Sequence, residues 1–280
     1  MKVLKFGGSS VKNAERIQQV CAILKPYQAA DEQFVVVFSA FGGVTDLLLG
    51  MGELAAKANK SYLESIEQFK IRHYPVIDEL LKDEYKTTAQ TFVDERVIEI
   101  ENILKGIFLL KEGTKRAFDY LVSFGERCSS FIITQYLCQE GNTVSYLDAR
   151  EVIRTNDNFG NAIVNSEITT QQIETYFKEN TGNFIITGFI ASTEEGSTTT
   201  LGRGGSDYTA AIFGACLKAS VVEIWTDVAG IASTDPRICS EAKSISEIPY
   251  AEASEMAHYG AKILHPTTLV PAMRESIPVF

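Results

Sequence analysis

MKVLKF at residues 1–6 runs directly into GGSS at residues 7–10, and this junction decides the fold of the chain. Apolar residues then recur at helical spacing from Val11 to Leu24, so the stretch predicts a strand, a glycine turn and a helix. Two adjacent glycines let the backbone approach a ligand closely, and the start of a helix offers N–H groups to an anion. Lys5, at the end of the predicted strand, can direct a cation to the same place. The junction therefore suits a phosphate group.

The same glycine pair also fits a tight turn that binds nothing, because glycine pairs are common turn material. Neither G-x-x-x-x-G-K-[ST] nor G-x-G-x-x-G spacing occurs at this junction. The two best-known phosphate loops are therefore excluded there, and further residues must decide between a binding turn and a structural one.

Composition fits a globular α/β protein and argues against several partners. The 280 residues are 45% hydrophobic and 22% charged, which allows one large domain or two smaller ones. The net charge of -10 argues against nucleic acid, and it requires a local group of Lys and Arg for any anionic ligand. Five scattered cysteines without C-x-x-C spacing predict free thiols in a reducing cytoplasm. We expect no signal peptide and no membrane span.

Strand-like and helix-like segments alternate along the chain. Strands are predicted at residues 34–38, 144–147, 183–189 and 221–225, and helices at residues 47–58, 118–138, 251–264 and 269–275. Residues 61–110 are expected to form a helical insertion with its main break at Pro75, and the polar run 193–200 a mobile loop. Residues 277–280 resemble the opening of another strand, which suggests that the architecture continues beyond them. The pattern predicts a three-layer α/β/α sandwich with a mostly parallel sheet.

Glycine-rich turns, several with a charged residue, follow the predicted strands, and ligands of such sheets bind at the carboxyl ends of strands. Two of these turns are contained in KFGGSSV (5–11) and GRGGSD (202–207). Further segments accompany them elsewhere in the chain: FSA (38–40), GVTD (43–46), FGE (124–126), WTDV (225–228), TDPR (234–237), GAK (260–262) and LHP (264–266). Together and in their order along the chain, these segments closely resemble the amino acid kinase superfamily, and within it the aspartokinases. The resemblance covers essentially the whole chain.

The resemblance implies ATP-dependent phosphorylation of the side-chain carboxylate of L-aspartate to 4-phospho-L-aspartate, with Mg²⁺. This reaction begins lysine, threonine and methionine biosynthesis. It implies a catalytic domain at 1–280, with an aspartate lobe at about 1–200 and a nucleotide lobe at 201–280. C-terminal regulatory domains are expected to be absent, and the longer protein is expected to form a homodimer or higher homo-oligomer. The segments 1–17 and 91–110 resemble the kinase part of enzymes fused to a homoserine dehydrogenase.

The resemblance also assigns roles to individual residues. The catalytic group is Lys5, Asp207 and Lys262. Aspartate is expected to meet Ser39, Thr45, Glu126, Arg203 and Ser206. The nucleotide is expected to meet Lys5, Gly7, Gly8, Ser9, Thr226, Asp227, Arg237 and Lys262, and no metal ligand is assigned directly. Arg203 suits the α-carboxylate because a guanidinium binds it through two hydrogen bonds, and Glu126 suits the ammonium.

Some residues keep a structural alternative. Lys262 could simply lie on the solvated face at a helix end, and Glu126 could be the ion-pair partner of Arg127. Residues 198–200 could be a solvated polar run, and we assign them no catalytic role. Ala232 departs from a tyrosine that is frequent in the family, which puts one adenosine contact in doubt. The three histidines have no metal or triad spacing, and we expect each in the core or on the surface.

Two other functions compete with aspartate phosphorylation. The first is an amino-acid sensor without catalysis, which would have no need of phosphoryl-stabilising cations such as Lys5 and Lys262. The second is a kinase for another acceptor, such as an acetylated glutamate or a carbamate. Glu126 favours an acceptor with a free amine. An acetylated amine has no positive charge and would leave the carboxylate of Glu126 without a partner.

Overall fold

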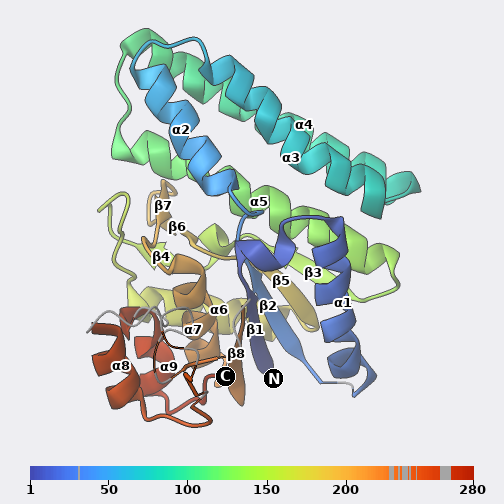
Figure 1. The fold of residues 1–280 in the computed structure, drawn as a ribbon, viewed down its shortest axis with the longest axis vertical. Helices are drawn as coiled ribbons and strands as arrows, with labels where there is room; N and C mark the ends of the chain where they lie inside the picture. Colours follow the sequence, from blue (N-terminus) through green and yellow to red (C-terminus); the bar gives the residue numbers. More distant parts are fainter. Residues whose placement is uncertain are drawn as a thin grey trace.

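A five-stranded parallel sheet forms the centre of the molecule (Figure 1). The computed structural model describes residues 1–30, 32–226, 230–232, 234, 239, 241–243, 245–258 and 266–280. In spatial order the strands are β3 (Val144–Leu147), β5 (Asn183–Thr187), β2 (Phe34–Phe38), β1 (Lys2–Phe6) and β8 (Val221–Trp225). The predicted strands are confirmed, although β5 ends two residues earlier than expected.

Both faces of the sheet are buried, as β2 shows best. Its alternating side chains divide between two apolar clusters: Phe34, Val36 and Phe38 belong to one, and Val35 and Val37 to the other. All five are 0% exposed. Successive side chains of a strand point to opposite faces, so each cluster is the core between the sheet and one layer of helices. The three-layer α/β/α class is confirmed.

Helices cover the two faces in separate groups. One face carries α1 (Ala14–Ala29) and α5 (Lys115–Gln139), and the other carries α6 (Ser166–Glu179), α7 (Gly205–Cys216) and α9 (Val270–Arg274). The short helices are η1 (Gly8–Val11), η2 (Ala149–Glu151) and η3 (Pro266–Leu269), and α8 spans Tyr250–His258. No described helix has both the length and the apolar character that a membrane crossing requires.

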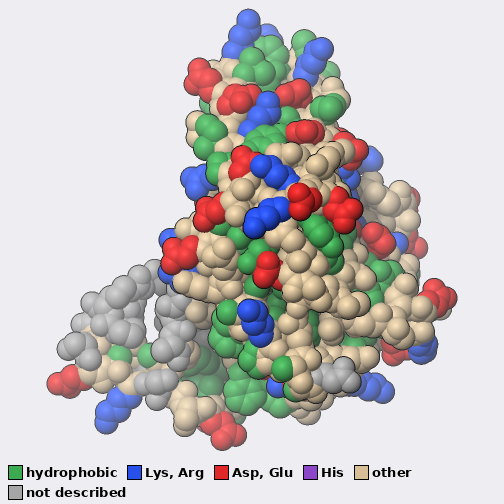
Figure 2. Space-filling model, turned by 90° about the vertical axis from the view of Figure 1, so that its right-hand side faces the viewer, with side chains coloured by type: hydrophobic (Ala, Val, Ile, Leu, Met, Phe, Trp, Pro, Cys, Tyr) green, Lys and Arg blue, Asp and Glu red, His purple; other side chains and the backbone are tan. Residues whose placement is uncertain are grey.

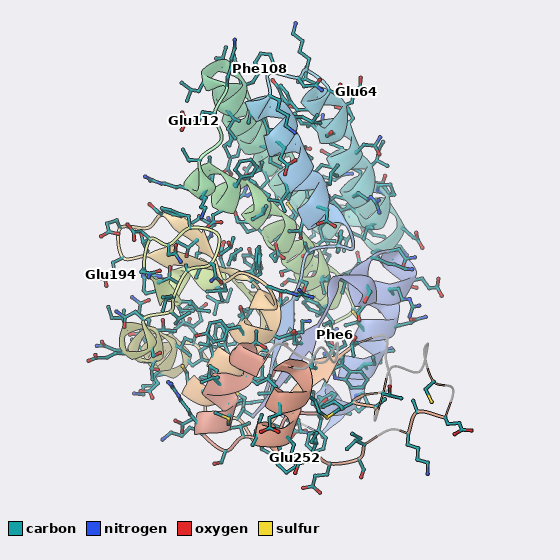
Figure 3. All side chains as sticks on the ribbon, turned by 60° about the vertical axis from the view of Figure 1, so that its left-hand side comes forward. Phe6, Glu64, Phe108, Glu112, Glu194 and Glu252 are labelled. Atoms are coloured by element: carbon teal, nitrogen blue, oxygen red, sulfur yellow. The ribbon has the colours of Figure 1, made fainter. Side chains whose placement is uncertain are left out.

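A helical layer of α2 (Val44–Ala56), α3 (Tyr62–Leu80) and α4 (Asp83–Leu110) packs on α5 at the end of the molecule far from both termini (Figure 1). Figure 3 places Glu64, Phe108 and Glu112 at this far end, whereas Phe6 lies near the centre. On the face shown in Figure 2, acidic and basic side chains are interspersed over this layer rather than gathered by sign.

The predicted break at Pro75 is wrong. Pro75 lies inside α3, and the chain turns instead at Leu81, whose backbone is extended, and at Asp83, whose φ is +48°. An interior proline removes one hydrogen bond from a helix, but α3 buries Ile66, Phe69 and other residues of one face. This packing outweighs the lost bond.

The predicted mobile loop at residues 193–200 is also wrong. These residues belong to a hairpin of β6 (Ile190–Thr193) and β7 (Thr198–Thr200), and β6 also pairs with β4 (Arg154–Thr155). The tip between β6 and β7 is exposed, and Glu194 lies there at the edge of the molecule (Figure 3). The threonines of β7 are buried, because their hydroxyls find partners inside the protein.

The last residues return to the sheet. Val279 forms a parallel bridge with Val222 of β8, which agrees with the strand expected at residues 277–280. The predicted helix 251–264 is described as far as His258, and its expected break near Gly260 lies outside the described residues. The helix expected at residues 269–275 corresponds to α9.

Candidate active site

A pocket of about 330 Å³ opens where β1, β2 and β5 end. Its walls come from the turns that follow these strands, from the starts of α2 and α7, and from the middle of α5. The lining residues include Lys5, Gly8, Ser39, Thr45, Asp46, Glu126, Phe189, Gly202, Gly204, Ser206 and Asp207. Segments spread over two hundred residues of sequence therefore meet in one cavity.

Lys5 and Asp207 form the principal charge pair of the pocket. Lys5 Nζ lies 2.6 Å from Asp207 Oδ1, and the two side chains are 12% and 15% exposed. Lys5 ends β1 and Asp207 is in the first turn of α7, so the pair joins two elements that the sequence places far apart. A nearly buried lysine beside a cavity is well placed to bind an anion without competition from bulk water.

A second polar contact ties the end of β2 to α7. Ser39 Oγ lies 2.9 Å from Ser206 Oγ, and both serines line the pocket. The close packing here depends on Gly188, where a Cβ atom would lie 2.6 Å from Ser206 Oγ and 3.0 Å from the carbonyl oxygen of Phe38. A side chain at residue 188 would displace Ser206.

Two helices begin at the pocket without a side-chain cap. The N-cap of α2 is Gly43, at φ +80°, and that of α7 is Gly204, at φ +72°. Left-handed backbone of this kind favours glycine. Because no capping side chain covers these helix starts, their partial positive charge faces the cavity and favours an anion.

Glu126 is the buried carboxyl group of the site. It is 3% exposed, and its Oε1 accepts a hydrogen bond of 3.2 Å from the backbone N–H of Ala40. Its Oε2 has no hydrogen-bond partner within the described part of the chain. Burial raises the pKa of Glu126 from 4.5 to about 8, against the smaller opposite effect of the Ala40 N–H. A cationic ligand would supply the missing partner.

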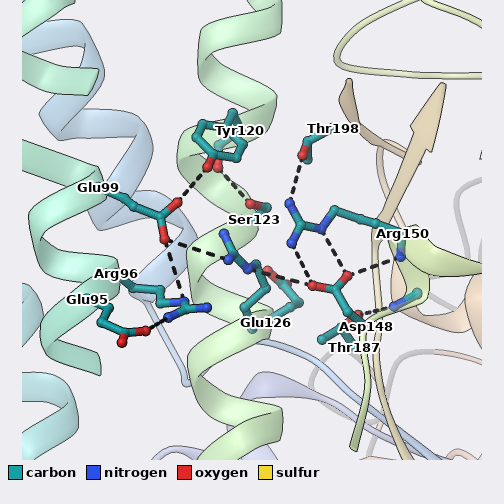
Figure 4. A network of polar contacts seen from close by, with 12 residues as sticks. Glu95, Arg96, Glu99, Tyr120, Ser123, Glu126, Asp148, Arg150, Thr187 and Thr198 are labelled. Carbon is teal, nitrogen blue, oxygen red and sulfur yellow. Dashed lines mark hydrogen bonds and ion pairs between the residues drawn. The ribbon is translucent and has the colours of Figure 1, made fainter. Parts of the chain in front are cut away.

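A network of charges beside Glu126 holds α5 in place (Figure 4). Arg127 lies 3.9 Å from Glu99 of α4 and 3.7 Å from Asp148, which follows β3. Asp148 in turn accepts two side-chain hydrogen bonds from Arg150, at 2.9 and 2.7 Å. Arg127 thus pairs with other carboxylates than Glu126, which leaves Glu126 available to the pocket.

Several predicted residues lie away from the lining. Arg203 is exposed, although its neighbours Gly202 and Gly204 line the pocket. Ser9 is exposed, and a Cβ atom at Gly7 would lie 3.5 Å from Lys5 Nζ. Thr226 is exposed directly after β8. Asp227, Arg237 and Lys262 lie outside the described residues.

Phe189, Phe41 and Asp46 are among the lining residues for which the sequence predicted no role. Phe189 has φ +69°, which is rare for a bulky residue, and it follows Gly188, the residue directly after β5. Phe41 stacks on His73 with 5.2 Å between the ring centroids, and Asp46 lies in the first turn of α2. Phe41 and Asp46 lie in the glycine-containing segment 39–46 that follows β2, and this segment was the available signal for both, whereas Phe189 was predicted to be part of a strand. His73 is 0% exposed, as expected for a core histidine.

No group of three or more His, Cys, Asp or Glu side chains suited to a metal ion occurs among the residues the structure describes. Magnesium, however, is usually held by one or two carboxylates together with phosphate oxygens of the substrate. Asp207 and Asp46 both line the pocket and supply carboxylates of this kind.

Known proteins resemble the chain throughout its length. It matches the amino acid kinase family over residues 1–280. Lysine-sensitive aspartokinase 3 of Escherichia coli K12 is 39% identical over 288 residues, covering 99% of this chain and 60% of that protein. A chloroplastic bifunctional aspartokinase/homoserine dehydrogenase of Zea mays is 34% identical, with 99% of this chain and 30% of that protein covered.

A solved structure agrees with these relatives. E. coli aspartokinase III in complex with aspartate and ADP has a TM-score of 0.91 at 37% identity, covering 100% of this chain and 61% of that one. The chain thus spans about three fifths of the length of its E. coli relative. With the pocket at the carboxyl edge of a parallel sheet and a family match from end to end, the chain belongs to the amino acid kinase family.

Proposed function

We propose that the chain is the catalytic part of an aspartokinase, which transfers the γ-phosphoryl group of ATP to the side-chain carboxylate of L-aspartate. The product would be 4-phospho-L-aspartate, the first intermediate toward lysine, threonine and methionine. The observation that carries this proposal is one pocket that combines the Lys5–Asp207 pair with a buried carboxyl group, Glu126, whose Oε2 has no partner among the described residues. The aspartokinase relatives support it.

The electrostatics of the pocket suit phosphoryl transfer to a carboxylate. A carboxylate is already a nucleophile at neutral pH, so the reaction needs positioning and charge stabilisation more than a strong base. Lys5 would meet the oxygens of the moving phosphoryl group, and the start of α7 would add its partial positive charge. Asp207 would hold Lys5 in place before the substrates bind.

Aspartate carries an ammonium group and two carboxylates, and each has a candidate partner. Glu126 would receive the ammonium, and Arg203 would turn inward to bind the α-carboxylate. Ser39, Thr45 and Ser206 would donate hydrogen bonds to carboxylate oxygens. Gly202 and Gly204, which flank Arg203, both have positive φ, so this short loop presents its side chain without the constraint of a helix.

The nucleotide would occupy the side of the pocket toward β8. Thr226 follows that strand at the same edge of the sheet, and Gly8 lines the cavity. Gly7, Ser9, Asp227, Arg237 and Lys262 complete the proposed nucleotide contacts, with a catalytic role for Lys262. Magnesium bound to ATP would be held by Asp207 and Asp46, and would neutralise charge on the phosphates.

The wider organisation follows from the same proposal. The aspartate lobe would span about residues 1–200, with its helical insertion at 61–110, and the nucleotide lobe residues 201–280. The parent protein would be a cytoplasmic homodimer or higher homo-oligomer, whose regulatory domains lie outside this chain. All five cysteines are free, in agreement with a reducing compartment.

Trapping of the acyl phosphate with hydroxylamine tests the proposed reaction directly. With MgATP and L-aspartate we expect a hydroxamate, and none with N-acetylglutamate or without an acceptor. Hydroxamate with N-acetylglutamate alone would identify a kinase for another acceptor. Binding of aspartate without turnover would favour a sensor.

Replacement of Lys5 by alanine should lower kcat about 10²–10³-fold, comparable to the loss of one preorganised oxyanion donor. Aspartate binding should survive, because the charge that Lys5 stabilises develops on the phosphoryl group. Steady-state kinetics and calorimetry measure the two effects. Lys105→Ala removes an exposed lysine from α4 and serves as the control. A near-normal kcat for Lys5→Ala would refute the role.

Binding of aspartate at pH 7 should release close to one proton. The pKa of Glu126 near 8 keeps the free site mostly protonated at this pH, and an ammonium group beside it would lower that pKa. Calorimetry in two buffers of different ionisation enthalpy measures the release. It should vanish in Glu126→Gln and fall toward zero by about pH 9, where the free site is already ionised. Unchanged release in Glu126→Gln would exclude Glu126 as the ammonium partner.

Replacement of Arg203 by alanine should mainly raise the KM for aspartate, because the contact with the α-carboxylate exists in the ground state and the transition state alike. The loss of one charged hydrogen-bonding partner predicts an increase of about 10-fold or more. Kinetics with aspartate varied at saturating MgATP measure it. An unchanged KM for aspartate would count against this role.

A further inference from the structure

The three threonines of β7 lead directly into the loop that carries Arg203, and all three are buried. Thr198, Thr199 and Thr200 are 6%, 0% and 2% exposed. Arg150 Nη1 donates to Thr198 Oγ1 at 2.9 Å (Figure 4), and Thr199 Oγ1 lies 2.7 Å from Thr155 Oγ1. Each hydroxyl therefore has a partner from another segment. This arrangement differs from the solvated run that the composition suggested.

Asp119 of α5 is the partner of Thr200. Its Oδ1 accepts the Thr200 hydroxyl at 2.8 Å, and its Oδ2 accepts the backbone N–H of Thr200 at 3.0 Å and that of Gly160 at 2.9 Å. The carboxylate is 3% exposed. Burial of such a group is costly unless it is hydrogen-bonded, so these three bonds define its place. Asp119 ties together α5, β7 and the loop around Gly160.

The loop around Gly160 then fixes the chain beyond Thr200. The backbone N–H of Ala162 donates to the Thr200 carbonyl at 2.9 Å. Gly202 lies so close to Asn161 that a Cβ atom there would be 2.3 Å from Asn161 Oδ1. On the other side, the N–H of Leu201 donates to the carbonyl of Phe189, a pocket-lining residue, at 2.9 Å. Backbone hydrogen bonds at Thr200 and Leu201 therefore fix the chain that leads into the loop of Arg203.

The same helix carries both Asp119 and Glu126. Seven residues separate them, which is about two turns or roughly 10 Å along the axis. The helix itself is fixed by the ion pairs of Arg127 with Glu99 and Asp148. One rigid element therefore sets the position of Glu126 directly and that of the Arg203 loop through Asp119.

We propose that Asp119 and Thr200 form a positioning clamp that sets the distance between the two ends of an α-amino-acid substrate. Glu126 receives the ammonium, and the clamp holds the Arg203 loop where its guanidinium reaches the α-carboxylate. This inference rests on the proposed function. Asp119 and Thr200 are positioning residues, because they act through Arg203 and touch neither substrate.

The kinetic test separates the two substrates. Thr200→Val keeps the shape of the side chain but removes its hydrogen bond, and it should raise the KM for aspartate about 3- to 10-fold. Asp119→Ala should raise it about 10-fold or more, with the KM for MgATP changed less than about twofold in both variants. Thr200→Ser, which keeps the hydroxyl, should restore the KM for aspartate. Asp157→Ala removes an exposed acid from the same loop and is the matched control.

Coupling to Arg203 provides the decisive readout. In an Arg203→Ala background, Thr200→Val should no longer change the KM for aspartate, because the residue through which it acts is gone. A purely structural defect would affect both substrates and would persist in that background, and this result would overturn the clamp. Should Asp119→Ala not fold, Thr200→Val carries the test.

Hydrogen exchange makes the test independent of the proposed reaction. Backbone amides of residues 201–206 should exchange faster in Thr200→Val than in the wild type and in Thr200→Ser. Wild-type protein that forms no aspartyl hydroxamate would defeat the proposed function, while the exchange rates still decide the clamp. Wild-type turnover of aspartate with unchanged exchange and KM in Thr200→Val would defeat the clamp alone.

Discussion

Burial of both faces of the central sheet is the constraint on which the rest of the structure depends. The apolar side chains of β2 fill two separate cores, so neither face has room for an unpaired polar group. Polar side chains can face open space at the ends of the strands, and parallel strands bring all their carboxyl ends to one edge. Lys5, Ser39 and Gly188 meet at that edge for this reason. The apolar residues of the sheet therefore determine where the pocket lies, although they do not line it.

The charge balance inside the pocket differs from that of the whole chain, whose net charge is -10. Lys5 is the one cation among the described lining residues, whereas Asp46, Glu126 and Asp207 are carboxyl groups. The pairing of Asp207 with Lys5 and the raised pKa of Glu126 remove most of this negative charge near pH 7. The starts of α2 and α7 add partial positive charge. The free site is therefore much less repulsive to an anion than its composition indicates.

The sequence was sufficient to predict the sheet and the location of the pocket at the carboxyl ends of its strands, because both depend on local patterns. Continuous apolar runs mark buried strands, and the turn after each strand must lie at the common edge. The exposed position of the Arg203 side chain, outside the pocket lining, could not be predicted in this way. Its loop lies between two glycines with positive φ, so its side chain is not fixed by a helix or a strand. Phe189 was missed because the left-handed backbone of a bulky residue has no signature in the sequence.

The two wrong predictions about the fold, at Pro75 and at residues 193–200, have one physical origin. In both places, contacts that are distant in the sequence stabilise a structure that the local sequence disfavours. Pro75 weakens α3, but the buried face of that helix supplies the missing stability. The threonines of β7 are polar enough for a loop, yet Asp119, 81 residues from Thr200, and Thr155, 44 residues from Thr199, complete their hydrogen bonds. A buried polar network that is fully satisfied specifies one arrangement more strictly than apolar contacts do, since any shift leaves a donor or acceptor unpaired. A strand of threonines is therefore well suited to hold the loop that follows it, and local composition alone cannot distinguish such a strand from a solvated run.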